Sequence, residues 1–223
     1  MRLQSVSYMK YLIRVPLNTT PEQHARLCAL RAVFARACNA LAPQVQQSRV
    51  WNRVALHHLH YRTLRAEFPE LGSQMVCNAI YAVSKMSRLI YQAPASPFNV
   101  TRRPGQSLPL LKFADSCPVY FDRHTLSLKP GQLSLFTMDG RMRFELQLEA
   151  EKLALFEQTK LREIVLNERA DKIFELSFYL VSADTPEASE GVDADVSEVA
   201  QDGAAAPLSP SIPEYVSVEV AQA

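Results

Sequence analysis

Residues 20–41 read TPEQHARLCALRAVFARACNAL, the clearest helix signature in the chain. Thr20 can cap the helix, Pro21 suits the first helical position, and Gln23 completes a capping box with Thr20. Apolar side chains then recur at the three- and four-residue spacing of one buried helix face. They are Leu27, Leu30, Phe34, Cys38 and Leu41. We expect Pro43 to end or kink this helix.

Two more helices are expected after this one. The pattern predicts a second helix over about residues 52–67 and a third from Ser73, as its cap, to about Gln92. The intervening segment, Phe68–Gly72, has the composition of a turn. Residues 93–105 contain three prolines and a glycine, which indicate an irregular linker.

From Leu110 onward the apolar period changes to two, which is typical of strands. The expected short strands span residues 111–114, 119–121, 125–128, 133–137 and 141–148. Asp139-Gly140 is the strongest hairpin signal in the chain. Residues 161–167 and 173–181 are expected to form a last hairpin around residues 168–171. Residues 149–158 are ambiguous, with a short helix as one interpretation.

Residues 5–18 also have a strand pattern, which Pro16 limits to the edge or the end of a sheet. We expect this lone first strand to join the later strands, so that the helices are an insertion into a small antiparallel β-barrel. The expected fold class is therefore α+β. The first strand falls in residues 1–19, the helical lobe in 20–105 and the rest of the barrel in 106–182. Residues 183–223, rich in Ala, Ser, Pro, Gly and acids, are expected to be a disordered acidic tail.

Charge is distributed very unevenly along the chain. Residues 1–105 hold fourteen Lys and Arg against Glu22, Glu67 and Glu70, a formal charge of +11, although the whole chain carries only +1. Residues 106–182 are near neutral, and residues 183–223 carry nine acids and no Lys or Arg. The basic residues of 1–105 repel one another unless a polyanion binds them. We expect the affinity for such a polyanion to fall steeply with salt.

Several other kinds of site find no support. The cysteines form no CxxC pair, which argues against a zinc site. His57, His58 and His60 lack an HExxH motif, so we expect polar or RNA-facing histidines and no metal. No signal peptide or membrane anchor is recognisable, and we expect free thiols in a reducing cytoplasm. No Gly-rich phosphate loop or catalytic triad is present, and no cofactor is expected.

Two motifs follow the expected linker. Residues 119–128 read VYFDRHTLSL and residues 133–141 read LSLFTMDGR. They resemble the wedge domain of TnpB proteins, transposon-encoded, RNA-guided DNA nucleases related to type V CRISPR effectors. The family pattern there is a tyrosine–aspartate–arginine start followed by an sLlT-x-x-GR strand and turn. The helical part resembles the family's recognition lobe, through Phe34 with Asn39, the segment His60–Gln74, and Ala79-Ile80.

The resemblance covers about residues 8–181 and implies a wedge-type barrel with an inserted recognition lobe. It also implies binding of a guide-type RNA and of double-stranded DNA next to the target. The family's RuvC-like nuclease domain, with three carboxylates for two metal ions, is not expected in this chain. Gly191-Val192-Asp193 resembles the opening of that domain and is either a coincidence in an acidic tail or a decayed vestige. We therefore expect no enzyme, because the RuvC-like catalytic carboxylates are missing.

The expected nucleic-acid contacts are mainly arginines, whose guanidinium groups bind phosphate bidentately and stack on bases. The full set is Arg26, Arg31, Arg36, Arg49, Arg53, Tyr61, Arg62, Arg65, Gln74, Asn78, Lys85, Arg88, Arg102, Arg103, Arg123, Thr137, Arg141 and Arg143. The resemblance implies that residues near Gln74, Asn78 and Thr137 recognise the DNA motif that flanks the target.

Each of these residues has a structural alternative. Tyr61 either stacks a base or packs against Phe68 or Leu64. Trp51 is expected to pack in the core or between helices, with base stacking as the alternative. Gln74 and Asn78 either contact adenine edges or cap a helix. The three arginines of the later strands either bind RNA backbone or pair with neighbouring carboxylates. These arginines are Arg123, Arg141 and Arg143, and the carboxylates are those of Asp122, Asp139 and Glu145.

The function expected from all of this is a nucleic-acid-binding, TnpB-like protein without a nuclease domain. It could work with a separately encoded nuclease subunit, act as a repressor-like binder, or be a truncated transposon-associated remnant. The alternative is a protein–protein adaptor whose basic helical bundle binds an acidic partner, with the acidic tail folding back over the basic surface. An enzyme is a third possibility, favoured only by the crowded histidines.

Overall fold

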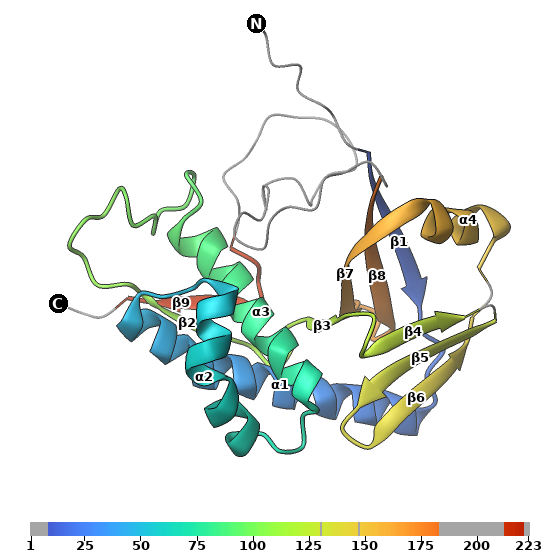
Figure 1. The fold of residues 1–223 in the computed structure, drawn as a ribbon. Coiled ribbons are helices and arrows are strands. Elements are labelled where there is room, and N and C mark those ends of the chain that lie inside the picture. Colours follow the sequence, from blue (N-terminus) through green and yellow to red (C-terminus); the bar gives the residue numbers. More distant parts are fainter. Residues whose placement is uncertain (1–8, 130, 147, 183–211, 221–223) are drawn as a thin grey trace, which may run out of the picture. The chain divides into compact units, whose positions relative to one another are not determined.

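The computed structural model describes residues 9–129, 131–146, 148–182 and 212–220 (Figure 1). Its helices are α1 (Pro21–Ser48), α2 (Arg53–Glu67), α3 (Ser73–Tyr91) and α4 (Ala150–Gln158). The chain divides into two compact units. The sheet unit contains Met1–Leu27 and Pro118–Glu187, and the helical unit contains Cys28–Cys117 and Ala188–Ala223. Helix α1 begins in the sheet unit and continues in the helical unit.

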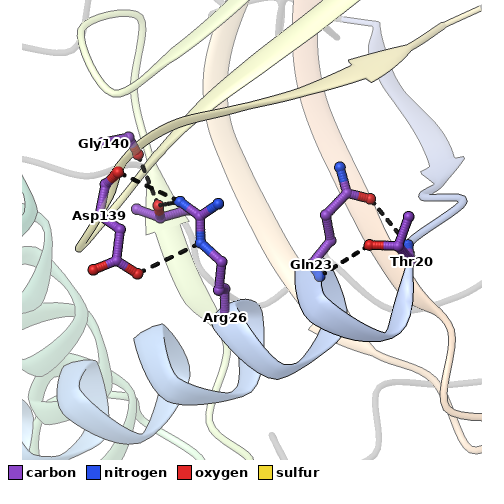
Figure 2. Close-up of polar contacts among 6 residues, drawn as sticks. Thr20, Gln23, Arg26, Asp139 and Gly140 are labelled. Carbon is purple, nitrogen blue, oxygen red and sulfur yellow. Dashed lines mark hydrogen bonds and ion pairs between the residues drawn. The ribbon is translucent and has the colours of Figure 1, made fainter.

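Helix α1 begins as the sequence predicts. Thr20 Oγ1 accepts from the Gln23 N–H at 3.2 Å and Gln23 Oε1 accepts from the Thr20 N–H at 2.9 Å, which is a reciprocal capping box (Figure 2). The helix does not end at Pro43 but continues to Ser48. Beyond Pro43, Val45 is buried and Gln46 Nε2 donates to Leu108 O at 2.8 Å. These contacts offset the missing proline N–H.

The next two helices have the predicted positions, but the N-cap of α3 differs. Asn52 caps α2, because its side chain accepts from the N–H groups of Val54 and Ala55 at 3.0 and 3.1 Å. The prediction that Ser73 caps α3 is wrong. Gly72 occupies the cap position, which provides no side-chain hydrogen bond, and Ser73 is the first helical residue. Within the described residues, no helix is both long and apolar enough to cross a membrane.

The larger sheet of the sheet unit has the strand order β1-β8-β7-β3, all antiparallel. These strands are β1 (Lys10–Pro16), β8 (Phe174–Ser182), β7 (Thr159–Glu168) and β3 (Val119–Phe121). Strand β1 pairs with β8 along its whole length, with Ile13 and Val15 buried on one face. The prediction that the first strand joins the later strands across a helical insertion is confirmed.

The smaller sheet of this unit is a meander of β4 (Leu126–Lys129), β5 (Gln132–Thr137) and β6 (Gly140–Glu145). Its buried face includes Leu133, Leu135, Met142 and Phe144. The expected single barrel is not present, because the described strands form three separate antiparallel sheets. In the described residues β4, β5 and β6 pair only with one another. One further strand that was expected in the barrel belongs to the helical unit. Residues 150–158 take the helical alternative as α4.

That displaced strand is β2 (Leu110–Phe113), which pairs antiparallel with β9 (Val216–Glu219), drawn in red beside it in Figure 1. The prediction of disorder throughout residues 183–223 is therefore wrong for residues 212–220. Val216 is buried there, and this β-branched residue belongs to a local strand pattern within the acidic sequence. Residues 183–211, with Gly191-Val192-Asp193, and residues 221–223 lie outside the described part of the chain.

Candidate nucleic-acid interface

One face of α1 binds the segment that leads into β2. Asn39 Nδ2 donates to Phe113 O and Asn39 Oδ1 accepts from the Phe113 N–H, both at 2.8 Å. Farther along the helix, Gln46 Nε2 donates to Leu108 O at 2.8 Å, and Arg49 Nη1 donates to Gln106 O at 3.1 Å. Residues 106–113 therefore run antiparallel to α1, with their backbone fixed at three points by helix side chains.

The loop before this segment, expected to be an irregular linker, is well ordered by Asn99. This side chain is 5% exposed, and its Nδ2 donates to the carbonyls of Gln92 and Ala93 at 2.8 and 3.0 Å. Its Oδ1 accepts from the N–H groups of Thr101 and Arg102 at 2.9 and 3.3 Å. One buried amide thus fixes the turn that carries Arg102 and Arg103.

Arg102 and Arg103 belong to this loop, and Arg49 and Arg103 both contact its Gln106. Gln106 accepts from Arg49 Nη1 through its backbone carbonyl, at 3.1 Å, and from Arg103 Nε through its side-chain Oε1, at 2.5 Å. The Arg103 guanidinium also lies 5.6 Å from the ring centroid of Phe98. We call Arg49, Arg102 and Arg103 the arginine cluster. Within the described residues, no carboxylate forms an ion pair with any of the three.

Arg49 has an unusual backbone conformation. Its φ is 57°, in the left-handed region, directly after the last residue of α1. Glycine usually occupies such a position, because a side chain there costs about 1–2 kcal/mol. The chain therefore carries an arginine where the helix end alone would favour glycine. Such local strain often accompanies a functional side chain.

Arg53 and Trp51 flank the start of α2. The Arg53 guanidinium lies 5.2 Å from the ring centroid of Tyr81, and Arg53 is exposed. Trp51 Nε1 donates to Gln92 Oε1 at 3.3 Å, and its ring lies 5.6 Å from the ring of Tyr91. These contacts agree with the packing interpretation of Trp51, since Tyr91 is the last residue of α3 and Gln92 is its C-cap.

Helix α2 provides two further predicted residues at its surface. The Tyr61 ring stacks on His57 at 4.7 Å, so the packing partner is neither Phe68 nor Leu64 in this contact. Arg62 is exposed. Arg65 instead has a structural role, since its Nη1 donates to the carbonyls of Phe68 and Leu71 in the turn before α3. The nearby His60 is half-buried, and burial lowers its pKa.

Arg26 and Thr137 are brought together inside the sheet unit, and Figure 2 shows Arg26 reaching the turn that carries Asp139 and Gly140. Thr137 Oγ1 donates to Gly140 O at 2.7 Å and accepts from Arg26 Nη2 at 3.0 Å, while Arg26 Nε lies 3.5 Å from Asp139 Oδ2. Thr137 is 1% exposed. The Thr137 hydroxyl therefore has a structural role in this structure, since it closes the β5–β6 turn and is covered by Arg26.

Asn78 is also misassigned by the sequence. It is 4% exposed, because α3 is buried on most of its surface, so it cannot contact a base edge. Arg36 is exposed but pairs with Glu70 at 3.1 Å. The remaining predicted residues of this unit are half-buried, and each interacts with another group. They are Arg31, Gln74, Lys85 and Arg88.

The arginines of the sheet unit lie around the β4–β6 meander. Arg141 Nη2 donates to His124 O at 3.0 Å, and its Nη1 lies 3.5 Å from Ser134 Oγ. Arg123 and Arg143 are exposed. None of the three forms an ion pair with a described carboxylate. The alternative in which they pair with neighbouring acids is therefore not realised in the described part of the chain.

The cysteines have the environment of ordinary core thiols. None of the four forms a disulfide, and Cys38 and Cys117 are buried. Burial raises the pKa of Cys117 to about 12 and raises that of Cys38 well above its usual value. Thiols with raised pKa values are poor nucleophiles at neutral pH. The prediction of free thiols is confirmed.

Some residues of the interface had escaped the sequence prediction. Asn99 and Gln106 were not predicted, because amide side chains are common in proline-rich linkers. Phe98 was not predicted, because its contact with Arg103 depends on the fold. The nearby X-Pro and Asn-Val pairs signal only a turn.

A scan against protein-family models and a search of curated proteins both give no match to the chain. The described residues thus form a mixed α+β fold with an arginine cluster that has no carboxylate partner among them.

Proposed function

We propose that this protein binds nucleic acid through its helical unit, with guide-type RNA as the first ligand and double-stranded DNA flanking a target as the second. The observation that carries the proposal is the arginine cluster, in which Arg49, Arg102 and Arg103 have no carboxylate partner among the described residues. Protein surfaces normally intersperse both signs of charge. Acid-free guanidinium groups on an ordered loop are therefore suited to a polyanion.

The charge of the helical unit supports the same ligand. Residues 28–117 contain eleven Lys and Arg against Glu67, Glu70 and Asp115. Arg53 and Arg62 are exposed and add to the arginine cluster, whereas Arg36 and Arg65 are engaged by protein groups. Binding would be driven by phosphate contacts and counterion release, with little sequence discrimination by the protein itself. Structured RNA suits this mode, because its shape and backbone are what proteins chiefly recognise.

The finer proposal is a TnpB-like wedge and recognition lobe without its nuclease. Two features support it. Strand β1 returns to pair with β8 across the helical insertion, the order that the resemblance implies. The Thr137–Arg141 motif forms an ordered turn with Gly140 at a φ of 95°. In this proposal Arg123, Arg141 and Arg143 around the β4–β6 meander add contacts to the RNA backbone. Any cleavage of DNA comes from a separately encoded nuclease. The chain itself is not an enzyme in this proposal.

A second candidate is an adaptor that binds a protein partner through α2. Val54 and Leu59 of this helix are 42% and 59% exposed, and exposed apolar side chains are common at protein interfaces. Arg62 lies on the same helix and is exposed. An acidic partner with an apolar patch would match this surface.

The two candidates are separated by purifying the protein without nuclease treatment and identifying what accompanies it. The nucleic-acid proposal expects RNA of defined size, released by high salt or ribonuclease. The triple variant Arg49→Ala, Arg102→Ala, Arg103→Ala should lose most of this RNA, and Arg36→Ala should keep it. A protein that is free of nucleic acid, and that binds neither RNA nor DNA when these are added, would contradict the proposal.

A further inference from the structure

Phe98 is a half-buried aromatic residue in the ordered loop that carries Arg102 and Arg103. Its N–H donates to Ser96 Oγ at 3.2 Å, and the Ser96 hydroxyl donates in turn to the carbonyl of Ile90 near the end of α3. Asn99, the next residue, fixes the turn through its own four hydrogen bonds. Because Ser96 and Asn99 are both buried, the backbone on either side of Phe98 is held in place.

The Phe98 ring adjoins a guanidinium group. The Arg103 guanidinium lies 5.6 Å from the ring centroid, within the range of a cation–π contact. Gln106 Oε1 accepts from Arg103 Nε at 2.5 Å and restrains the same group. A guanidinium is planar and, like an aromatic ring, stacks on the face of a base. We call Phe98 and Arg103 the stacking pair.

Phosphate-binding groups lie beside the stacking pair. Arg102 precedes Arg103 in the chain, and Arg49 contacts the backbone carbonyl of the same Gln106. Arg49 and Arg102 are exposed. Within the described residues, Nη1 and Nη2 of Arg103 form no hydrogen bond or ion pair, so both can donate to a phosphate. The loop therefore offers cations for a backbone and a π surface for a base.

This combination distinguishes unpaired from paired nucleic acid. Inside a duplex the faces of each base are covered by its neighbours, whereas an unpaired base can turn out and stack on a protein side chain. Such stacking tolerates any sequence, because every base has a π face. A purely electrostatic site would instead favour the duplex, which has the higher charge density. Preference for a single strand is thus the property that stacking adds to the arginine cluster.

We propose that Phe98 and Arg103 stack on an unpaired base, so that the helical unit selects single-stranded segments of RNA. This inference rests on the proposed nucleic-acid function and names the part of the RNA that the arginine cluster binds. The cluster contacts the phosphates of the strand, and the stacking pair holds a base beside them.

The test compares labelled RNAs of equal length by fluorescence anisotropy. They are a single-stranded oligouridylate, a blunt-ended duplex, and a strand that keeps its phosphates but lacks its bases. Phe98→Leu keeps an apolar side chain and removes the aromatic face. Arg103→Lys keeps the charge and removes the planar group. Tyr61→Leu is the matched control, since the Tyr61 ring stacks on His57 of α2 and lies outside the ordered loop.

We expect the unsubstituted protein to bind the oligouridylate about fivefold or more tightly than the base-free strand, because one stacked base has an effect of this size. Phe98→Leu and Arg103→Lys should each bring this ratio close to one, while affinity for the base-free strand and for the duplex stays the same. Tyr61→Leu should keep the ratio of the unsubstituted protein.

Thermal unfolding shows whether each variant is folded. If Phe98→Leu does not fold, Arg103→Lys carries the comparison, because it leaves the ring in place. A folded variant of either residue that keeps the full ratio would overturn the stacking proposal. So would an unsubstituted protein that binds the oligouridylate and the base-free strand equally.

The same measurements separate this proposal from the function on which it rests. If the unsubstituted protein does not discriminate between the two strands, but the triple variant of the arginine cluster still loses binding, stacking fails and the proposed function stands. If the unsubstituted protein binds none of the three RNAs and no duplex DNA, both fail.

Discussion

The Asn39 side chain pairs with the backbone of Phe113 as a neighbouring strand would, donating to its carbonyl and accepting from its N–H at 2.8 Å each. These bonds join the middle of α1 to strand β2. They also satisfy both backbone groups of Phe113 on the edge of β2 opposite β9. The position of residues 106–113, and with it that of Gln106, depends on this amide.

Asn39→Leu should destabilise the protein markedly. The substitution keeps the size of the side chain but leaves the partly buried N–H and C=O of Phe113 without their partners, at about 1–3 kcal/mol for each unsatisfied group. Urea unfolding measures the loss. Asn39→Asp, which keeps the acceptor and removes the donor, should lose less. An Asn39→Leu protein as stable as the unsubstituted one would rule out this role of the amide.

Thr137→Val should lower stability without lowering nucleic-acid affinity. The valine has the same shape but loses the hydrogen bonds to Gly140 O and from Arg26, at a position that is 1% exposed. We expect a loss of about 1–3 kcal/mol in the free energy of unfolding. Thr137→Ser keeps the hydroxyl and should lose less, about 1 kcal/mol for a buried methyl group. Weaker RNA binding by a folded Thr137→Val protein would show that this residue does reach the ligand.

Arg49→Gly should separate stability from binding. Glycine adopts the φ of 57° without cost, which offsets the lost hydrogen bond to Gln106, so the free energy of unfolding should stay within about 1 kcal/mol. RNA affinity should nevertheless fall, because one guanidinium of the arginine cluster is gone. Thermal unfolding and anisotropy are the two measurements. Arg49→Lys, which keeps the charge, is the control and should retain most of the affinity.

The triple variant of the arginine cluster should reduce the salt dependence of binding. Each phosphate contact that is lost lowers the slope of log K against log salt by about 0.7 for single strands and about 0.9 for duplex DNA. Arg49→Ala, Arg102→Ala, Arg103→Ala should therefore flatten this slope. Arg36→Ala should leave it unchanged, since that guanidinium already pairs with Glu70. Equal slopes for all three proteins would place the phosphate contacts elsewhere.

His60 should make stability depend on pH in the mildly acidic range. Burial lowers its pKa below the ordinary 6.5, and its Nε2 atom is inaccessible and lacks a hydrogen-bond partner among the described residues. The unfolded state binds the proton more readily, so stability is full above pH 6.5 and falls as pH drops toward the folded pKa. His60→Gln should reduce this pH dependence. His58→Gln, at an exposed site on the same helix, should not change it.

Local signals account for what the sequence predicts well. The Thr20–Gln23 capping box, the start of α2 and the β7–β8 hairpin each depend on residues close together in the chain. That β1 joins the later strands was predicted for a topological reason, because a lone strand needs a partner, but its pairing with β8 in particular was not predicted. Packing was the favoured interpretation of Trp51, the only Trp of the chain, although its partners Gln92 and Tyr91 were not predicted.

The features that the sequence did not predict depend on interactions between distant residues. Thr137 is buried because Arg26, far away in the sequence, covers its hydroxyl, and no local pattern encodes that contact. Strand β9 lies in an acidic stretch whose composition does not suggest a strand. Its partner β2 is separated from it in the sequence by residues 118–187 of the sheet unit. Pro43 is tolerated because Val45 and Gln46 pack beyond it. The Asn99 turn depends on four hydrogen bonds within a segment that composition alone marks as irregular.

The pairing of β1 with β8 has a consequence for biosynthesis. Lys10 leaves the ribosome early, but its partner Val181 is among the last residues of the sheet to be made. Strand β8 lies between β1 and β7, so this central strand is missing from the sheet until synthesis has passed Ser182. Such long-range pairing makes folding slow and leaves β1 exposed on the nascent chain. The helices, which need only local contacts, can form while β1 still awaits its partner.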